Sequence, residues 1–306
     1  MAAPGATLPS FELHRPTRVG EACRLLAEHG PDAQVYAGGT ELLLVLRSGL
    51  AEIPHLVDVK RLAGLTSVWR SGDAIRIGGA VPHAKAAAAP ELADVAPALV
   101  EAERRLGNVR VRATGTLGGN LCFAEPHGDP GTALLAHDAR VTLESIRGVR
   151  TLALEEFLVA ALETVREPDE ILTHVELPAR RFDGAAYVRH TYAERPTAGV
   201  AVLLDGADGR AHDVRIAIGC IGPRPLRVAA AEEAATGIPL DAGDDLLAAI
   251  GEAAAGALEP LSDAYGPADY KRRLTATLVS RALRQACARA GTPGAPAQRP
   301  GSPGPG

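Results

Sequence analysis

A short apolar segment that runs into a glycine pair places the strongest limit on how this chain can fold. Residues 34–37 have the composition of a buried strand, a Gly-Gly-Thr turn follows at 38–40, and residues 41–48 continue as a very apolar helix. This order predicts an α/β unit whose glycines lie at the carboxyl end of the strand. We expect the apolar run Leu42–Leu46 to belong to the core.

The segments around this unit alternate between helical and extended patterns. Apolar spacing predicts a helix over 17–29 with Thr17 as its N-cap, and a strand over 55–59. A hairpin of 66–70 with 74–77 begins a second layer. Further helices are predicted over 95–106 and 131–137, and further strands over 139–144, 149–152 and 171–177. The mixture indicates an α+β protein.

From residue 185 onward the pattern changes to an antiparallel meander followed by helices. Strands are predicted over 187–192, 198–204 and 214–219, a turn over 206–209, and helices over 246–258 and 270–289. Residues 291–306 are rich in proline and glycine without apolar anchors, so we expect a disordered tail. Because a chain of 306 residues exceeds the size of a typical single core, more than one domain is expected.

The charge of the chain excludes several classes of partner. A net charge of -5 gives no general attraction to nucleic acid or to anionic membranes. The N-terminal segment lacks the basic start and apolar stretch of a signal peptide, and no run of 18 apolar residues occurs. These features predict a soluble, cytoplasmic protein without an integral membrane segment.

Cysteine and histidine patterns give no sign of a metal in this chain. The four cysteines, Cys23, Cys122, Cys220 and Cys287, form no CxxC or cluster spacing, so we interpret them as reduced and mostly structural. The nine histidines show neither HExxH nor HxH spacing. We therefore predict no protein-bound metal here, and we expect any metal chemistry to lie in a partner.

Three glycine pairs occur, and two of them stand in a context that suggests ligand binding. The pairs at 38–39 and 118–119 have a Thr or an Asn beside them and lead from one predicted element to the next, unlike the pair at 78–79. Such loops can present consecutive backbone N–H groups to a diphosphate, which the missing Cβ allows to approach closely. Equally, they can be ordinary tight turns with Thr40 and Asn120 as caps. The residues alone leave both interpretations open.

Known phosphate-binding fingerprints narrow the alternatives. The chain has no GxxxxGK[ST], which excludes a P-loop, and no strand–GxGxxG–helix, which disfavours a Rossmann dinucleotide site.

An ordered set of motifs resembles a known family. Residues 35–42 (VYAGGTEL) and 111–120 (VRATGTLGGN), followed by Pro126 and Asp129, are similar to the FAD-binding medium subunits of the xanthine dehydrogenase and carbon monoxide dehydrogenase family of molybdenum hydroxylases. The match continues through the segments 170–172, 176–178, 186–189 and 270–274, and it covers roughly residues 8 to 290 in the family's order.

The resemblance implies an FAD-binding fold of the p-cresol methylhydroxylase type. Two α/β subdomains, 1–60 and 61–180, would surround the cofactor, and residues 181–290 would form a C-terminal α+β domain with an antiparallel sheet. FAD would be bound non-covalently, and the isoalloxazine ring would perform the redox chemistry without a catalytic side chain.

The resemblance also implies a set of cofactor-binding residues. Residues 37–42 and 116–120 would line the diphosphate and ribityl region, and Arg189 stands where relatives commonly carry Lys, a change that alters hydrogen-bond geometry more than charge. The implied set is Val35, Tyr36, Ala37, Gly38, Gly39, Thr40, Glu41, Leu42, Leu106, Thr116, Leu117, Gly118, Gly119, Asn120, Asp129, Leu172 and Arg189.

Three other residues, His127, Cys122 and Trp69, could also take part. His127 is expected to be a solvated loop residue, and Cys122 a structural thiol rather than a redox group. Tyr36 has a better claim than Trp69 to stack on a flavin ring, because it adjoins the first glycine pair.

The family further implies partners that this chain lacks. A molybdopterin-binding large subunit would oxidise the substrate, a small subunit with [2Fe-2S] clusters would pass the electrons on, and FAD in this heterotrimer would deliver them to NAD, a quinone or oxygen. Two alternatives remain open, namely a self-sufficient flavin oxidase of the same fold and a flavin-free interaction subunit.

Overall fold

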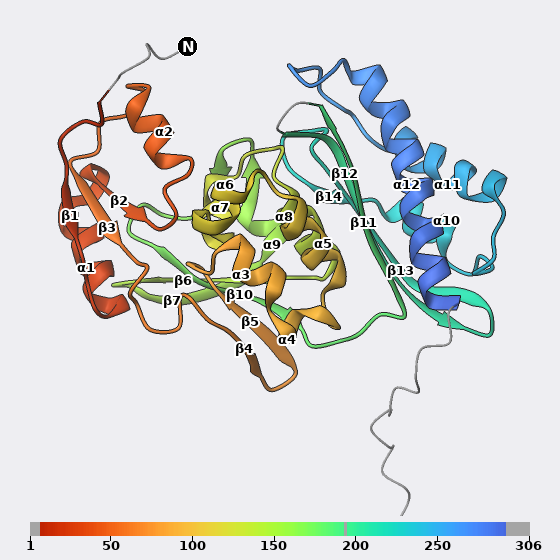
Figure 1. Ribbon diagram of the computed structural model, residues 1–306, viewed down its shortest axis with the longest axis horizontal. Helices are drawn as coiled ribbons and strands as arrows, with labels where there is room; N and C mark the ends of the chain where they lie inside the picture. Colours follow the sequence, from red (N-terminus) through yellow and green to blue (C-terminus); the bar gives the residue numbers. More distant parts are fainter. Residues whose placement is uncertain (1–6, 193–194, 292–306) are drawn as a thin grey trace, which may run out of the picture.

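Three lobes follow one another along the chain, each built on its own β-sheet (Figure 1). The structure is a computed structural model and describes residues 7–192 and 195–291. The tail predicted at 291–306 lies outside the described residues except for Gly291. Among the described residues, no helix has both the length and the apolar character that crossing a bilayer requires.

The first lobe has a three-stranded parallel sheet in the order β1-β3-β2, with α1 packed on one face. Its elements are β1 (Glu12–His14), α1 (Val19–His29), a 3-10 turn (Gly30–Asp32), β2 (Ala33–Tyr36), α2 (Leu42–Arg47) and β3 (His55–Asp58). The predicted strand–turn–helix order is present, and the turn at 38–40 follows the carboxyl end of β2.

The start of α1 differs from the prediction. The helix begins at Val19 and its N-cap residue is Arg18, not Thr17. Thr17 directs both its backbone N–H and its hydroxyl to the carboxylate of Glu21, at 2.8 and 3.3 Å. The threonine therefore precedes the cap and binds an acidic side chain of the first turn.

The apolar run of α2 is not core, so that prediction was wrong. Leu46 is buried, but Leu44 is 58% exposed and the other residues of the run are only partly covered. Consecutive leucines in a helix point in different directions. In a helix of only six residues, part of the apolar run therefore faces away from the interior.

The second lobe contains a five-stranded antiparallel sheet in the order β4-β5-β10-β6-β7, with helices on one side. The last long strand, β10, lies in the centre between β5 and β6. Its strands are β4 (Val68–Ser71), β5 (Ala74–Gly78), β6 (Arg140–Ser145), β7 (Gly148–Ala153), β10 (Ile171–Pro178) and the small pair β8 (Leu158–Ala160) and β9 (Glu163–Thr164). Its helices are α3 (His83–Ala88), α4 (Pro90–Ala93), α5 (Pro97–Arg105), α6 (Val109–Thr114), α7 (Leu117–Phe123), α8 (Asp129–Ala136) and α9 (Leu154–Phe157).

The segment expected to be a glycine-rich loop is largely helical. Asn108 caps α6, and Thr116 caps α7 by accepting a hydrogen bond from the Gly119 N–H. The second glycine pair therefore lies in the first turn of α7. Helical periodicity does not reveal helices of six or seven residues, and the caps were the only available signal.

The third lobe is the antiparallel meander that the sequence predicts, closed by long helices. Its elements are β11 (Gly184–Tyr192), β12 (Arg195–Ala207), β13 (Arg210–Gly219), β14 (Leu226–Arg227), α10 (Ala229–Ala235), α11 (Asp244–Gly256) and α12 (Ala268–Gly291). Alternate residues face opposite sides. Tyr187 and Ala201 join the core of the second lobe, whereas Val188 and Val202 join the core beneath α11 and α12. The expected α+β architecture is confirmed.

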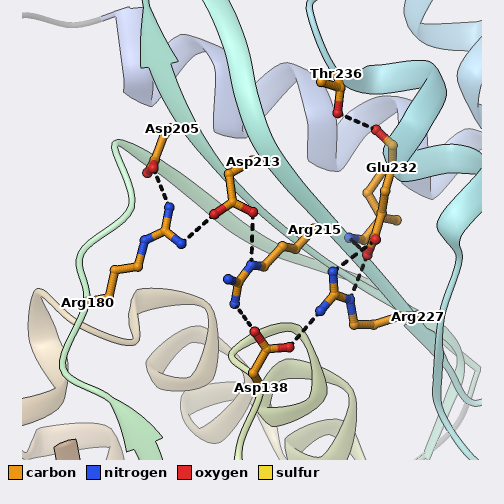
Figure 2. A network of polar contacts seen from close by, with 9 residues as sticks. Asp138, Arg180, Asp205, Asp213, Arg215, Arg227, Glu232 and Thr236 are labelled. Atoms are coloured by element: carbon orange, nitrogen blue, oxygen red, sulfur yellow. Dashed lines mark hydrogen bonds and ion pairs between the residues drawn. The ribbon is translucent and has the colours of Figure 1, made fainter. Parts of the chain in front are cut away.

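Ion pairs connect the third sheet to the second lobe (Figure 2). Asp138, just after α8, accepts from Arg215 at 2.5 Å and from Arg227 at 2.6 Å. Arg180, which follows β10, pairs with Asp205 and Asp213 of the third lobe. The boundaries at 60 and 180 stay predictions, although each of the three large sheets takes its strands from one of the three ranges.

Candidate functional site

A cavity of about 690 Å³ lies where the three lobes meet. Its wall is formed by the turn after β2, the first turn of α7, the start of β10 and the adjoining ends of β11 and β12. Of the predicted cofactor residues, those that line it are Val35, Ala37, Gly38, Gly39, Thr40, Glu41, Leu42, Leu106, Thr116, Gly118, Gly119, Asn120, Asp129, Leu172 and Arg189. The tertiary structure thus gathers segments more than 150 residues apart around one space.

Two predicted residues, Tyr36 and Leu117, do not line the cavity. The Tyr36 ring lies beneath the Lys60 ammonium, 3.7 Å from the ring centre, and Leu117 is fully buried in the core of the second lobe. Trp69 packs beside His174 on the second sheet. None of the three is positioned to stack on a ligand in the cavity.

The first glycine segment, residues 38–42, is open toward the cavity. Among the described residues, the backbone N–H groups of Gly38, Gly39, Thr40 and Glu41 have no protein acceptor. Gly39 has a φ of +72°, which favours glycine. Gly38 is required for packing, because an added Cβ would stand 2.2 Å from the Thr114 carbonyl oxygen. This segment can offer consecutive N–H donors to an anion.

The second segment, residues 115–120, has the N–H groups of residues 117–119 already bonded. The N–H groups of Leu117 and Gly118 donate to the carbonyls of Val81 and Gly79, both at 3.0 Å. The N–H of Gly119 donates to the Thr116 hydroxyl at 3.2 Å. Of the two interpretations that the sequence leaves open, donation by consecutive N–H groups therefore does not describe residues 117–119.

The glycines of the second segment allow close approach instead. A Cβ on Gly118 would lie 2.4 Å from the Gly79 carbonyl oxygen, so this glycine fits tightly against another backbone. A Cβ on Gly119 would meet only the Thr116 hydroxyl, at 2.8 Å. Gly119 thus leaves a bare backbone on the cavity wall where a ligand can approach.

The third glycine pair, at 78–79, carries no binding signal in the sequence but completes this arrangement. Gly79 lines the cavity, and a Cβ there would lie 2.1 Å from the Leu172 carbonyl oxygen. A Cβ on Gly78 would lie 2.3 Å from the Leu65 carbonyl oxygen. No Thr or Asn flanks this pair, so only tertiary contacts reveal its role.

A buried ion pair fixes the wall beside α7. Asp129, the first residue of α8, binds the Arg189 guanidinium at 2.5 Å and accepts a hydrogen bond from the Tyr187 hydroxyl at 2.7 Å. Burial raises the pKa of the Asp129 carboxyl, while Arg189 and Tyr187 oppose that rise. Burial also raises the pKa of Tyr187 well above its ordinary value, so its hydroxyl remains a donor.

A single arginine from the third lobe spans the cavity mouth. Arg195 binds Glu41 of the first glycine segment at 3.1 Å and Glu125, just beyond α7, at 2.6 Å. Burial raises the pKa of the Glu125 carboxyl, but the His127 hydrogen bond and the Arg195 charge outweigh burial and hold it below its ordinary value. The sequence offered no signal for Arg195 or Glu125, because the pairing joins residues 70 or more positions apart.

His127 is not the solvated loop residue that the sequence predicts. Its side chain is 9% exposed, with Nδ1 3.0 Å from Glu125 and Nε2 3.1 Å from Asp263. Asp263 in turn binds the fully buried Lys271 at 2.5 Å. The histidine loses its solvent because residues from the third lobe cover it, and it lines the cavity as part of a charged chain.

Cys122 also lines the cavity, and its environment favours the thiol. Burial raises its pKa, which lowers the fraction of nucleophilic thiolate. All four cysteines are free. A structural thiol therefore describes Cys122 better than a redox group.

A buried pair missed in the sequence lies behind the second segment. His83, whose ring lines the cavity, has Nδ1 2.7 Å from Glu103 Oε2, and both side chains are almost fully buried. The other Glu103 oxygen has no partner among the described residues. His83 N–H donates to the Gly115 carbonyl at 3.0 Å, so this pair also supports the turn that the first segment packs against.

Comparisons with known proteins agree with this architecture. Residues 9–180 match the family described as the FAD binding domain in molybdopterin dehydrogenase, and residues 189–286 match the CO dehydrogenase flavoprotein C-terminal domain. The chain is 34% identical over 286 residues to the nicotine 6-hydroxylase medium subunit of Paenarthrobacter nicotinovorans, covering 92% of this chain and 99% of the relative.

Solved structures give the same result in three dimensions. A chain of carbon monoxide dehydrogenase from Hydrogenophaga pseudoflava superposes with a TM-score of 0.87 at 32% identity, covering 92% of this chain and 99% of that one. A chain of quinoline 2-oxidoreductase from Pseudomonas putida 86 superposes with a TM-score of 0.88 at 26% identity, covering 93% and 99%.

Proposed function

Since the chain belongs to the family of FAD-binding medium subunits of molybdenum hydroxylases, we propose that it holds FAD in the cavity between its lobes and relays electrons inside a three-subunit complex. The chain is an FAD-dependent oxidoreductase subunit.

The observation that supports the proposal most directly is the structure of the cavity wall. One side offers backbone N–H groups without a protein acceptor at 38–41, and the other offers the bare backbone of Gly119. Free N–H groups can donate to a diphosphate, and a glycine without a Cβ lets a ligand approach the backbone closely. A volume of about 690 Å³ also falls in the range of cofactor sites. The residues present therefore fit FAD.

The residues around the cavity have different roles in the proposed binding of FAD. We assign residues 38–42 and Gly119 to the diphosphate, and Leu106 and Leu172 to apolar contact. The Asp129–Arg189 pair keeps α8 and β11 in place, and Arg195 holds Glu41 and Glu125 together across the mouth. When bound, FAD supplies the redox chemistry, and the protein supplies position and electrostatic environment.

The proposed partners follow from what the family implies and what this chain lacks. We propose that a molybdopterin-binding large subunit oxidises the substrate and that a small subunit with [2Fe-2S] clusters delivers the electrons here. NAD, a quinone or oxygen would then accept them. The proteins to which the chain is similar are named for three different substrates, namely nicotine, carbon monoxide and quinoline. Such varied substrates are expected if the large subunit selects the substrate.

The test of the central claim is flavin binding by the purified full chain. We expect the chain to retain one FAD after addition of the cofactor and desalting, seen in the visible absorption spectrum. Heating should release the flavin as FAD into the supernatant. A folded chain that stays colourless would overturn the proposal and favour the flavin-free interaction subunit. Flavin that remains in an acid pellet would indicate a covalent link and favour the self-sufficient oxidase.

A substitution at Gly119 tests the assignment of the second segment. Gly119→Ala adds a methyl group that meets only the Thr116 hydroxyl, so we expect the fold to survive with a loss of about 1 kcal/mol from the weakened cap. FAD affinity should fall at least about tenfold, because the methyl group occupies the approach to the wall. Gly256→Ala is the matched control, since that helical glycine is exposed with open space around it. Equal FAD affinity in both variants would remove Gly119 from the site.

A further inference from the structure

Three histidines that are remote in sequence meet at one edge of the first lobe. His14 ends β1, His29 is the last residue of α1, and His55 begins β3. Each offers a ring nitrogen, and the three candidate ligand atoms lie within 4.8 Å of one another. We propose that His14, His29 and His55 form a binding site for a divalent transition-metal ion, with Zn²⁺ the best fit.

The rings are already arranged closely. His14 Nε2 lies 3.1 Å from His55 Nδ1, and the rings of His29 and His55 stack with centres 3.8 Å apart. The carboxylate of Glu12 lies beside them, 3.6 Å from His55 Nδ1 and 3.9 Å from His14 Nδ1. The parallel register places Glu12 opposite His55 on adjacent strands, and His14, two residues further along β1, lies on the same face as Glu12.

The donor set suits zinc better than calcium or magnesium. Zn²⁺ favours imidazole nitrogen, with carboxylate oxygen as a further ligand, in four-coordinate geometry, whereas Mg²⁺ and Ca²⁺ favour oxygen ligands. Zn–N bonds of about 2.0–2.1 Å in a tetrahedron place the nitrogens roughly 3.4 Å apart. Ligand atoms within 4.8 Å therefore need to move by about 1 Å or less each, which side-chain rotation alone can supply.

Two features favour a cation at this position over a simple stack of neutral rings. His29 lies in the last turn of an 11-residue helix, where the partial negative charge of the helix end attracts positive charge. Glu12 adds a full negative charge and remains 67% exposed, free to swing toward an ion. The side chains of His14 and His55 are 14% and 24% exposed, so an ion can enter from solvent.

The site is separate from the flavin cavity. None of the three histidines lines that cavity. His55 is at the amino end of β3, whereas the first glycine segment follows the carboxyl end of the neighbouring parallel strand β2. A bound ion would join β1, α1 and β3, and thus stabilise the lobe that carries the glycine segment without contacting FAD.

The experiment uses the full chain loaded with FAD, without a histidine tag, treated with a chelator and then titrated with Zn²⁺. We expect one saturable equivalent of Zn²⁺ per chain and a higher midpoint of thermal unfolding with the metal present. The triple variant H14Q/H29Q/H55Q should lose this binding, and Glu12→Gln should weaken it about tenfold or less. His212→Gln is the control, because His212 is an exposed histidine on β13, and it should bind as the unmodified chain does.

A second measurement needs no variant and so does not depend on the triple variant folding. Zn²⁺ should slow the modification of His14 and His55 by diethyl pyrocarbonate, followed residue by residue by mass spectrometry, and leave His212 unchanged. The proposal is overturned if the unmodified chain binds no saturable Zn²⁺. It is also overturned if the folded triple variant binds as tightly, or if Zn²⁺ protects no residue of the cluster.

Discussion

The two glycine segments that line the cavity look alike in sequence but differ in what their backbones can do. In the segment 38–42, the N–H groups at 38–41 have no protein acceptor among the described residues. In the segment 115–120, hydrogen bonds to residues 79–81 and to a threonine cap occupy the N–H groups. One segment can donate to an anion, and the other gives a rigid wall.

A second contrast divides the glycines within each pair. Gly38 and Gly118 stand against other backbone, where a Cβ would come within 2.2 and 2.4 Å of a carbonyl oxygen. All four glycines line the cavity, but a Cβ on Gly39 or Gly119 would meet side chains only, the nearest being the Tyr36 ring at 2.6 Å and the Thr116 hydroxyl at 2.8 Å. In these two pairs the first glycine is required for packing against backbone and the second is not, whereas in the pair at 78–79 both glycines pack against backbone.

The largest expected effect comes from removing the charge that holds the wall of the second segment. Arg189→Gln leaves the buried Asp129 carboxylate with only the Tyr187 hydroxyl, and we expect a loss of about 3–5 kcal/mol in the free energy of unfolding. Arg189→Lys keeps the charge and should lose much less. Chemical denaturation of both variants measures the difference, and equal stability would show that the pair does not fix this wall.

The packing role of the first glycine in a pair predicts the next effect. Gly118→Ala would force its Cβ against the Gly79 backbone, so we expect a loss of about 2–3 kcal/mol and a lower yield of folded protein. The loss should exceed that of Gly119→Ala when both are compared by thermal unfolding. If Gly119→Ala proved the more damaging to stability, the proposed division within the pairs would be wrong.

The arginine that joins the two segments gives a pH-dependent prediction. The folded pKa of Glu125 lies below its ordinary value, so its ion pairs add stability that is present above the unfolded pKa and is lost as the pH falls through the folded pKa. Arg195→Gln removes one cause of the lowered pKa. We therefore expect about 1 kcal/mol to be lost at neutral pH and a smaller further loss on acidification than in the unmodified chain, measured by chemical denaturation across the pH range.

The control for this variant is Arg181→Gln, which breaks an exposed ion pair with Asp94, and neither residue lines the cavity. Its acid profile should follow that of the unmodified chain. A profile shared by both variants would mean that Arg195 does not act through Glu125.

The smallest expected effect concerns the helix after the first segment. Leu44→Ser should change the free energy of unfolding by no more than about 0.5 kcal/mol, since Leu44 is 58% exposed. Leu46→Ala, two positions away, should cost about 2–5 kcal/mol because Leu46 is buried. Thermal unfolding of the two variants measures the difference in stability. A large loss from Leu44→Ser would mean that the run Leu42–Leu46 belongs to the core after all.

The sequence predicted the third lobe better than the site. Strands β11–β13 are visible in the chain as apolar runs between turn residues, because both faces of this sheet are buried, each against a different core, through residues such as Tyr187 and Val188. The short helices α6 and α7 were not predicted, because a helix of six or seven residues shows little periodicity in the sequence. Of the site, the sequence selected both glycine segments but missed Gly79, Arg195 and Glu125.

By itself, the sequence determined the order of strands and helices and the motifs that relate the chain to flavin-binding medium subunits. These are local properties, set by the spacing of apolar residues and by the positions of glycine. Only the tertiary structure decided which N–H groups are free and at which glycines a Cβ would clash with neighbouring backbone. It also decided that His14, His29 and His55 meet. Each of these depends on which segments, tens of residues apart, are brought into contact by folding.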